Sequence, residues 1–110
     1  MNPPDGIPPK PLNRPLKPSE VVTAKKDHIP EIVFNVINSQ IVKEWNGTKA
    51  VVSYPVVVNI LDSAERFSRE NIHKMLSGIE EIYEQEGWSV VYDKPGYNES
   101  YAANWTFTKA

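Results

Sequence analysis

Apolar side chains recur at three- and four-residue spacing from residue 30 onward, and this spacing predicts a series of helices. The first helix is expected from Pro30 to Trp45. Its apolar stripe consists of Val33, Phe34, Ile37, Ile41 and Trp45. Proline suits a first helical position because its missing N–H would be unpaired there in any case. Asn46-Gly47 predicts the end of this helix, since glycine adopts the left-handed conformation of a helix cap.

A short strand over residues 49–53 and a second helix are expected next. Ser53 can cap that helix, and Pro55 falls in its first turn. The side chains expected to point inward are those of Val57, Val58 and Leu61. The β-branched residues here also permit a strand over residues 51–61. Proline in the middle of that strand disfavours this alternative.

Two further short helices are predicted, over residues 69–76 and 79–86. Ser68 can cap the first of them, and Ser77-Gly78 separates the two. The apolar positions expected to be buried are Ile72, Met75, Leu76, Ile79, Ile82 and Tyr83. Gly87 then ends the second helix.

The C-terminal segment alternates apolar and polar positions with a period of two, which predicts two strands. The first has Trp88, Val90 and Tyr92 on one face, and the second, which starts at Tyr101, includes Trp105 and Phe107. We expect the aromatic residues Trp88, Tyr92, Trp105 and Phe107 to face the core rather than to form a stacking platform for single-stranded nucleic acid. The turn-rich residues 94–100 between the strands predict a hairpin with a long loop.

The first 29 residues lack this patterning and predict a proline-rich, disordered arm ahead of one domain at residues 30–110. Eight of the ten prolines lie in the first thirty residues, where they disfavour both helix and paired strand. Residues 19–28 could hold one marginal helical turn. The spacings Pro8-x-x-Pro11 and Pro15-x-x-Pro18 match the core of motifs that aromatic grooves bind, although a simple tether has the same composition.

The predicted order of elements is helix, short strand, helix, helix and a two-stranded hairpin with a long loop. This α+β order is similar to that of winged-helix domains over about residues 30–109. The resemblance implies that residues 53–76 supply the first arm of a helix-turn-helix. It places the recognition helix at residues 79–86 and the wing at residues 94–100. The resemblance rests on topology, and the break at Ser77-Gly78 departs from the simplest pattern.

The C-terminal stretch GWSVVYDKPGYNESYAANWTFTK resembles a segment that recurs in small proteins of tailed bacteriophages. The preceding IEEIYEQEGW resembles the short helix that accompanies it. These resemblances imply a phage origin. They imply nothing about chemistry.

Charge argues against DNA binding through the helix at residues 79–86. Residues 30–110 carry seven bases and eleven acids, and four of the acids are the glutamates of this one helix. Carboxylates oppose phosphate, whereas a duplex binder needs several bases on the contact face. The glutamates therefore form either a simple solvated face or a face that docks a basic partner, and base readout by this helix is the least favoured of the three alternatives.

A second, less favoured way of binding DNA would use the loop and the arm. Its candidate nucleic-acid contacts are Lys25, Lys26, Lys94, Tyr97 and Tyr101. A loop of this kind can contact a minor groove or the phosphate backbone. The alternative role for its tyrosines is to pack as lids over the sheet.

Catalytic, metal and cofactor sites have no candidates in the sequence. The chain has no cysteine, and His28 and His73 each lack a second ligand at helical spacing. We therefore expect no enzyme, no cofactor and no metal. The N-terminus has no apolar signal region, and no apolar run has the roughly twenty residues of a membrane span, so we expect a cytoplasmic protein.

These observations favour a non-enzymatic phage-type binding protein that contacts a protein partner of host or phage machinery. The expected contact residues are Glu80, Glu81, Glu84, Tyr97 and Asn98. Two alternatives stay open. One is a DNA-binding winged-helix protein that uses the loop and arm, and the other is a structural, virion-associated protein. If the chain is phage-encoded, its compartment is the host cytoplasm.

Overall fold

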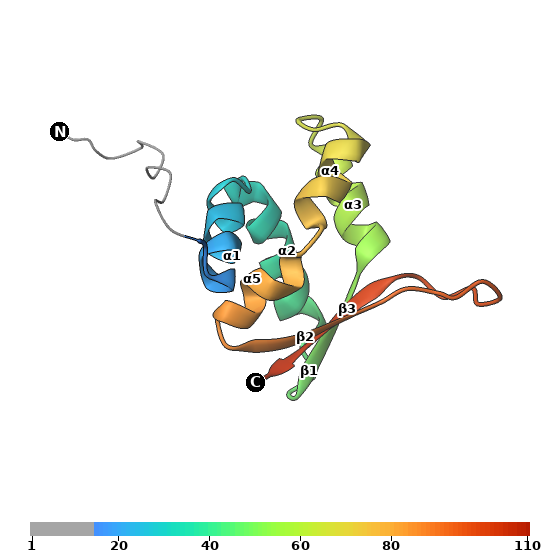
Figure 1. Cartoon of the computed structure of the whole chain (residues 1–110). Helices are drawn as coiled ribbons and strands as arrows, with labels where there is room; N and C mark the ends of the chain where they lie inside the picture. Colours follow the sequence, from blue (N-terminus) through green and yellow to red (C-terminus); the bar gives the residue numbers. More distant parts are fainter. Residues whose placement is uncertain (1–14) are drawn as a thin grey trace.

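A computed structural model of the chain describes residues 15–110, and within this range it has five helices and three strands (Figure 1). The elements are α1 (Pro18–Asp27), α2 (Glu31–Glu44), β1 (Lys49–Ser53), α3 (Tyr54–Ser63), α4 (Arg69–Leu76), α5 (Ile79–Gln85), β2 (Trp88–Asp93) and β3 (Asn104–Lys109). This mixture of helices and an antiparallel sheet confirms the predicted α+β class.

The predicted helix from Pro30 to Trp45 is confirmed as α2, with these two residues as its end caps. Beyond it, the Asn46 side chain accepts hydrogen bonds from the backbone N–H groups of Thr48 and Lys49 at 3.0 and 2.9 Å. Gly47 has φ +103°, as predicted for a left-handed residue. This tight turn feeds the chain directly into β1.

The three strands form one antiparallel sheet in the order β1-β3-β2. The chain leaves β1 for α3 at Tyr54, so the alternative strand over residues 51–61 is wrong. The helix forms because the Ser53 hydroxyl accepts a hydrogen bond from Val56 N–H and Pro55 fits the first turn.

The division between α4 and α5 is confirmed. Ser68 caps α4 by accepting a hydrogen bond from Asn71 N–H at 3.2 Å. Gly78 lies between the helices with φ +80°, a left-handed conformation that glycine adopts without strain. The break turns α5 away from α4 so that it runs beside α1 (Figure 1).

The core lies between the helices and one face of the sheet. Its largest fully buried side chains are Trp105, Phe107, Ile37, Leu61, Ile72, Leu76 and Ile79. The other face of the sheet is polar apart from Val51 and Val91, which flank Thr106 in one row across the three strands. This alternation confirms the period of two in the sequence and shows which face the helices cover.

The segment before residue 30 differs from the prediction of a disordered arm. The ten-residue helix α1 occupies Pro18–Asp27, where the sequence predicted at most one marginal turn, and it lies against α5. Three contacts stabilise it. The Glu20 carboxylate accepts from Lys17 N–H at 2.7 Å, the Gln85 amide donates to the Ser19 carbonyl at 3.2 Å, and Val22 packs on the core.

The predicted division into an arm at residues 1–29 and a domain at residues 30–110 therefore places α1 outside the domain, although α1 packs against α5. Pro18 is the first residue of this helix, so the Pro15-x-x-Pro18 spacing runs from extended backbone at Lys17 into a helix. The Pro8-x-x-Pro11 spacing lies outside the described residues.

The hairpin loop is longer than predicted. β3 begins at Asn104 and not at Tyr101, so the loop covers residues 94–103 and projects from the body of the molecule (Figure 1). Tyr101 leaves the ladder because its hydroxyl donates to the Asp93 carboxylate at 3.0 Å and lies 2.9 Å from the Lys94 carbonyl. These contacts fasten the base of the loop instead of extending the strand.

Candidate binding surfaces

The predicted acidic helix carries its glutamates on α5 and in the turn that follows. Glu81 and Glu84 are exposed, Glu80 is partly buried, and Glu86 forms an ion pair with Lys26 of α1 at 3.1 Å. Among residues 15–110, Glu86 is the one glutamate of this group with an ion pair inside 4.0 Å. The face therefore keeps most of its negative charge.

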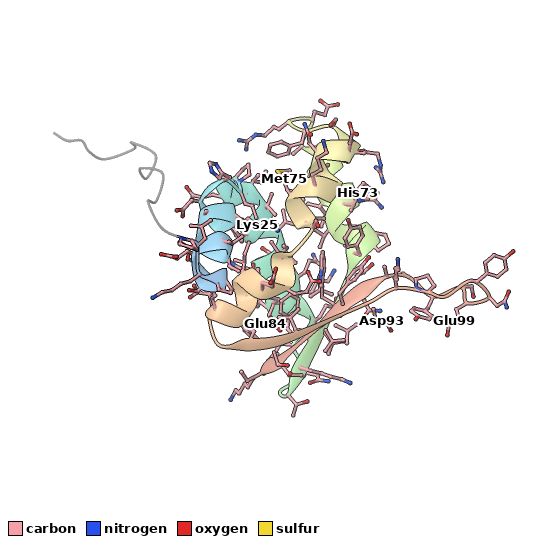
Figure 2. The ribbon with its side chains drawn as sticks, viewed as in Figure 1. Lys25, His73, Met75, Glu84, Asp93 and Glu99 are labelled. Atoms are coloured by element: carbon pink, nitrogen blue, oxygen red, sulfur yellow. The ribbon has the colours of Figure 1, made fainter. Side chains whose placement is uncertain are left out.

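The structure does not bring the predicted protein-contact residues onto one surface. Tyr97 and Asn98 lie at the tip of the projecting loop, and the Tyr97 side chain is fully exposed. Glu84 on α5 and Glu99 in the loop lie at opposite ends of the molecule (Figure 2). The prediction that loop tyrosines act as lids over the sheet is wrong for Tyr97, which contacts nothing that would cover it.

The bases of the predicted nucleic-acid surface are also divided. Lys26 is paired with Glu86, and the Lys25 ammonium lies 2.7 Å from the position that a Cβ of Gly78 would occupy. Lys94 lies instead at the start of the loop, directly after Asp93, and Asp93 is well separated from Lys25 (Figure 2). A DNA duplex that used all three lysines would therefore have to contact two separate parts of the protein.

A cavity of about 290 Å³ lies where α3, α4 and α5 meet the loop end of the sheet. Its aromatic and polar lining residues are Tyr54, His73, Ser77, Glu80, Tyr92 and Trp105. The strand-to-helix turn at Ser53 places Tyr54 here, and the break between α4 and α5 supplies Ser77 and Gly78. Each wall of the cavity thus comes from a different element.

Three aromatic rings form one side of this cavity. The ring centroid of Tyr54 lies 5.1 Å from that of Trp105 and 5.7 Å from that of Tyr92, and Tyr92 and Trp105 are 6.0 Å apart. The imidazole of His73 stacks on Tyr54 at 5.6 Å with an interplanar angle of 14°. The Tyr54 hydroxyl and His73 Nδ1 are hydrogen-bonded at 2.7 Å, which fixes both rings.

Glu80 is the one carboxylate among the lining residues. Burial raises the pKa of the Tyr54 hydroxyl, and Tyr92 and Glu80 raise it further. Burial and the Glu80 charge also raise the pKa of Tyr92. Both phenols are therefore neutral at physiological pH, and the negative charge of Glu80 acts on the whole aromatic wall.

Trp105 leaves an unsatisfied donor in this part of the fold. Its side chain is 1% exposed, and its indole N–H has no hydrogen-bond partner among residues 15–110. A buried donor without a partner costs about 1–3 kcal/mol. Because the nitrogen itself is buried, this donor is not open to a ligand in the cavity.

A second cavity, of about 250 Å³, differs in its polar groups. It lies among α1, α2, α5 and β2, and Lys26 there is already paired with Glu86. The Tyr83 hydroxyl donates to the Asn38 side chain at 2.7 Å. Because its polar lining residues have partners within the fold, this cavity offers a ligand little beyond apolar contact.

Sequence reasoning missed the first cavity. It predicted Tyr92 and Trp105 as core residues, which is confirmed for Trp105 and wrong for Tyr92, whose side chain is 39% exposed. Tyr92 faces the helical side of the sheet opposite Trp105, but the helices leave the cavity at that end. Tyr54 and His73 gave no sequence signal, because they are nineteen residues apart and meet through packing of α3 on α4.

Neither a metal cluster nor a membrane span is found in the described part of the chain. Residues 15–110 contain no group of three His, Cys, Asp or Glu side chains arranged to hold a metal ion. Every helix in this range is too short or too polar to cross a bilayer. Comparison of the chain with protein-family models, with curated proteins and with solved structures finds no match.

Proposed function

We propose that this chain is a non-enzymatic, phage-type binding protein whose winged-helix-like domain docks a basic surface of a protein partner. The proposal is supported by the position of α5, which follows the two preceding helices as a recognition helix would. The sheet order β1-β3-β2 with a projecting hairpin loop also fits a winged-helix-like arrangement.

The observation that carries the proposal is the charge on α5. Glu81 and Glu84 are exposed and have no ion pair among residues 15–110, in a helix at the position of a DNA reader. Lys25 lies near Glu81 and offsets part of this charge, whereas Glu84 is left to solvent. An uncompensated acidic face attracts a basic protein surface and repels phosphate.

The projecting loop supplies a second contact in this proposal. Tyrosine is enriched among the residues that dominate protein–protein binding, and Tyr97 is fully exposed at the loop tip. Because the loop tip and Glu84 lie at opposite ends of the molecule, one partner would have to be large enough to reach both (Figure 2). Otherwise the loop serves a different partner.

Neutralising the acidic face provides the test. Glu80, Glu81 and Glu84 are changed together to glutamine, and proteins captured from host lysate by this variant are compared with those captured by the unmodified chain. A second variant carries glutamine at Glu44, Glu65 and Glu70, three exposed positions outside α5. Both variants lose the same charge.

The proposal requires a basic protein that the unmodified chain and the second variant both retain and that the α5 variant loses. Equal capture by all three proteins would contradict docking through α5. Equal loss from both variants would indicate non-specific attraction to net negative charge, and would also contradict the proposal.

DNA binding through the loop is the second candidate, favoured by the exposed Tyr97 three residues after Lys94 on a wing-like loop. Isotope-labelled protein is titrated with a generic duplex at low and at physiological salt, and every backbone amide is followed by NMR. Shifts in residues 94–103 and 18–28 that fade with salt would support this candidate, because phosphate contacts weaken steeply with salt. Absence of shifts at both salt concentrations would eliminate it.

A further inference from the structure

The cavity between the helices and the hairpin has the chemistry of a receptor for a cation. Its aromatic wall consists of the rings of Tyr54 and Tyr92, whose centroids are 5.7 Å apart, backed by the buried ring of Trp105. Cations bind over ring faces of this kind, most strongly where water is excluded. Glu80 adds the one carboxylate of the lining, so a cation would gain both ring and ion-pair contacts.

The buried Trp105 ring supports this wall from behind. Its residue is 1% exposed and its indole nitrogen is buried, so it packs on Tyr54 and Tyr92 and does not contact an occupant of the cavity. The class of occupant follows from the proposed function, because a basic protein partner brings arginine and lysine side chains to α5.

Arginine fits this wall better than lysine. The guanidinium group is planar and weakly hydrated and stacks on aromatic faces, while its several N–H groups can reach a carboxylate in parallel. The lysine ammonium is a compact and strongly hydrated charge. The volume of about 290 Å³ lies just below the range of about 300–1,000 Å³ for ligand pockets, which suits a single side chain.

We propose that this cavity receives one arginine side chain of the partner protein, stacked on the Tyr54–Tyr92 wall with Glu80 as its counter-charge. The inference rests on the proposed function, because it specifies the residue with which a basic partner engages α5. Among residues 15–110, Glu80 forms no ion pair within 4.0 Å, so its carboxylate stays available to the ligand.

The test uses the full isotope-labelled chain and a capped glycine–arginine–glycine tripeptide. The indole N–H signal of Trp105 is assigned by its loss in Trp105→Phe and then followed during the titration. We expect saturable binding with a Kd on the order of 1 mM, with a shift of this signal because the Trp105 ring packs on the Tyr54 and Tyr92 rings that the ligand contacts. The matched peptide carries citrulline, which keeps the shape of arginine without its charge, and should bind at least about fivefold more weakly.

Two pairs of variants locate the site. Glu80→Gln should weaken arginine-peptide binding about fivefold, whereas Glu84→Gln, on the same helix but outside the cavity lining, should leave it unchanged. Tyr92→Phe retains the ring and should retain binding, and Tyr92→Leu should lose it. Because Tyr92 is partly exposed, both of its variants are expected to fold, which the dispersion of their NMR spectra would verify.

Equal binding of the arginine and citrulline peptides would overturn the inference, as would an unmoved Trp105 indole signal. Equal effects of the Glu80 and Glu84 variants would also overturn it, by attributing binding to general charge. The proposed function has a separate outcome. The α5 variant could lose its partner while the arginine peptide fails to bind the cavity. That result would support docking through α5 and would overturn the proposal that the cavity binds arginine.

Discussion

Gly78 is the residue on which the separation of α4 from α5 depends. Its φ of +80° is a conformation that costs an L-amino acid about 1–2 kcal/mol, and a Cβ there would meet the Lys25 ammonium at 2.7 Å. We expect Gly78→Ala to lower the free energy of unfolding by about 1–2 kcal/mol. Chemical denaturation followed by tryptophan fluorescence would measure the change.

Gly96→Ala is the matched control, since Gly96 has no left-handed φ and a Cβ there meets the flexible Glu99 carboxylate. We expect a change within about 0.5 kcal/mol for this exposed loop position. If both substitutions had equal effects, the left-handed conformation at Gly78 would not be what holds the break between the helices.

At the same scale, sequence reasoning located single residues by their local roles. Ser53, Ser68 and Gly78 were predicted from capping and turn preferences, which depend on neighbours in the chain, and all three are confirmed. Tyr54 and His73 could not be predicted as a pair, because no local preference encodes a contact between the start of one helix and the face of the next.

The loop of residues 94–103 is held at its base by Tyr101. Hydrogen bonding to Asp93 raises the pKa of the Tyr101 hydroxyl from 10.0 to about 12, with smaller effects of desolvation and of the charges of Asp93 and Glu99. The folded chain therefore keeps a proton that the unfolded chain releases between these two pH values. Since the unfolded state binds fewer protons there, stability falls as pH rises through this window.

Tyr101→Phe removes this titration. We expect the unmodified chain to lose stability more steeply than the variant between pH 10.0 and about 12, and to match its slope below that window. Denaturation at a series of alkaline pH values, with tyrosinate absorbance as a second signal, gives both slopes. Parallel slopes throughout the window would show that Tyr101 does not hold its proton through Asp93.

Helix α1 is the element that sequence reasoning most underestimated. It has no fully buried residue, and its contacts with α5 include an exposed ion pair, so no apolar stripe marked it in the sequence. Segments with few buried contacts open first in native proteins. We therefore expect backbone amides of α1 to exchange with deuterium faster than those of α2, which buries Val33, Ile37 and Ile41.

Lys26→Gln should speed exchange in α1 further and leave α2 unchanged, because it breaks the pair with Glu86. The effect should be small, as exposed ion pairs contribute about 0–1 kcal/mol. High salt should reproduce it in the unmodified chain by screening the same pair. Equal protection of α1 and α2 would show that α1 is an integral part of the cooperative core.

At the scale of the whole molecule, the sequence pattern predicts the core elements but does not predict the cavity on the surface. Periodicity predicted the helices and strands because each element buries one face, and this requirement repeats along the chain. The cavity lies where α3, α4, α5 and the hairpin fail to close, as the exposure of Tyr92 opposite the buried Trp105 shows. Such a gap depends on how elements meet, so no single stretch of sequence predicts it.

Phe107 tests whether the helices and the sheet form one cooperative unit. Its ring is fully buried. The ring centroid lies 5.3 Å from that of Tyr83 in α5 and 6.0 Å from that of Trp88 in β2. Phe107→Ala should cost about 3–5 kcal/mol, a large part of the roughly 5–15 kcal/mol that stabilises a typical domain. On the outer face of the same sheet, Val91→Ala should stay within about 0.5 kcal/mol.

The two substitutions are compared by far-UV circular dichroism, which follows the helices, and by the Trp105 indole NMR signal, which follows the cavity. For Phe107→Ala we expect both signals to be lost at one midpoint, shifted to lower denaturant, because β3 carries Phe107 in the core and Trp105 in the cavity wall. A cavity signal that disappears while helical content persists would contradict this cooperativity. In that case the hairpin and its cavity would open independently of the helices, and any ligand there would bind a segment that orders separately from the acidic helix.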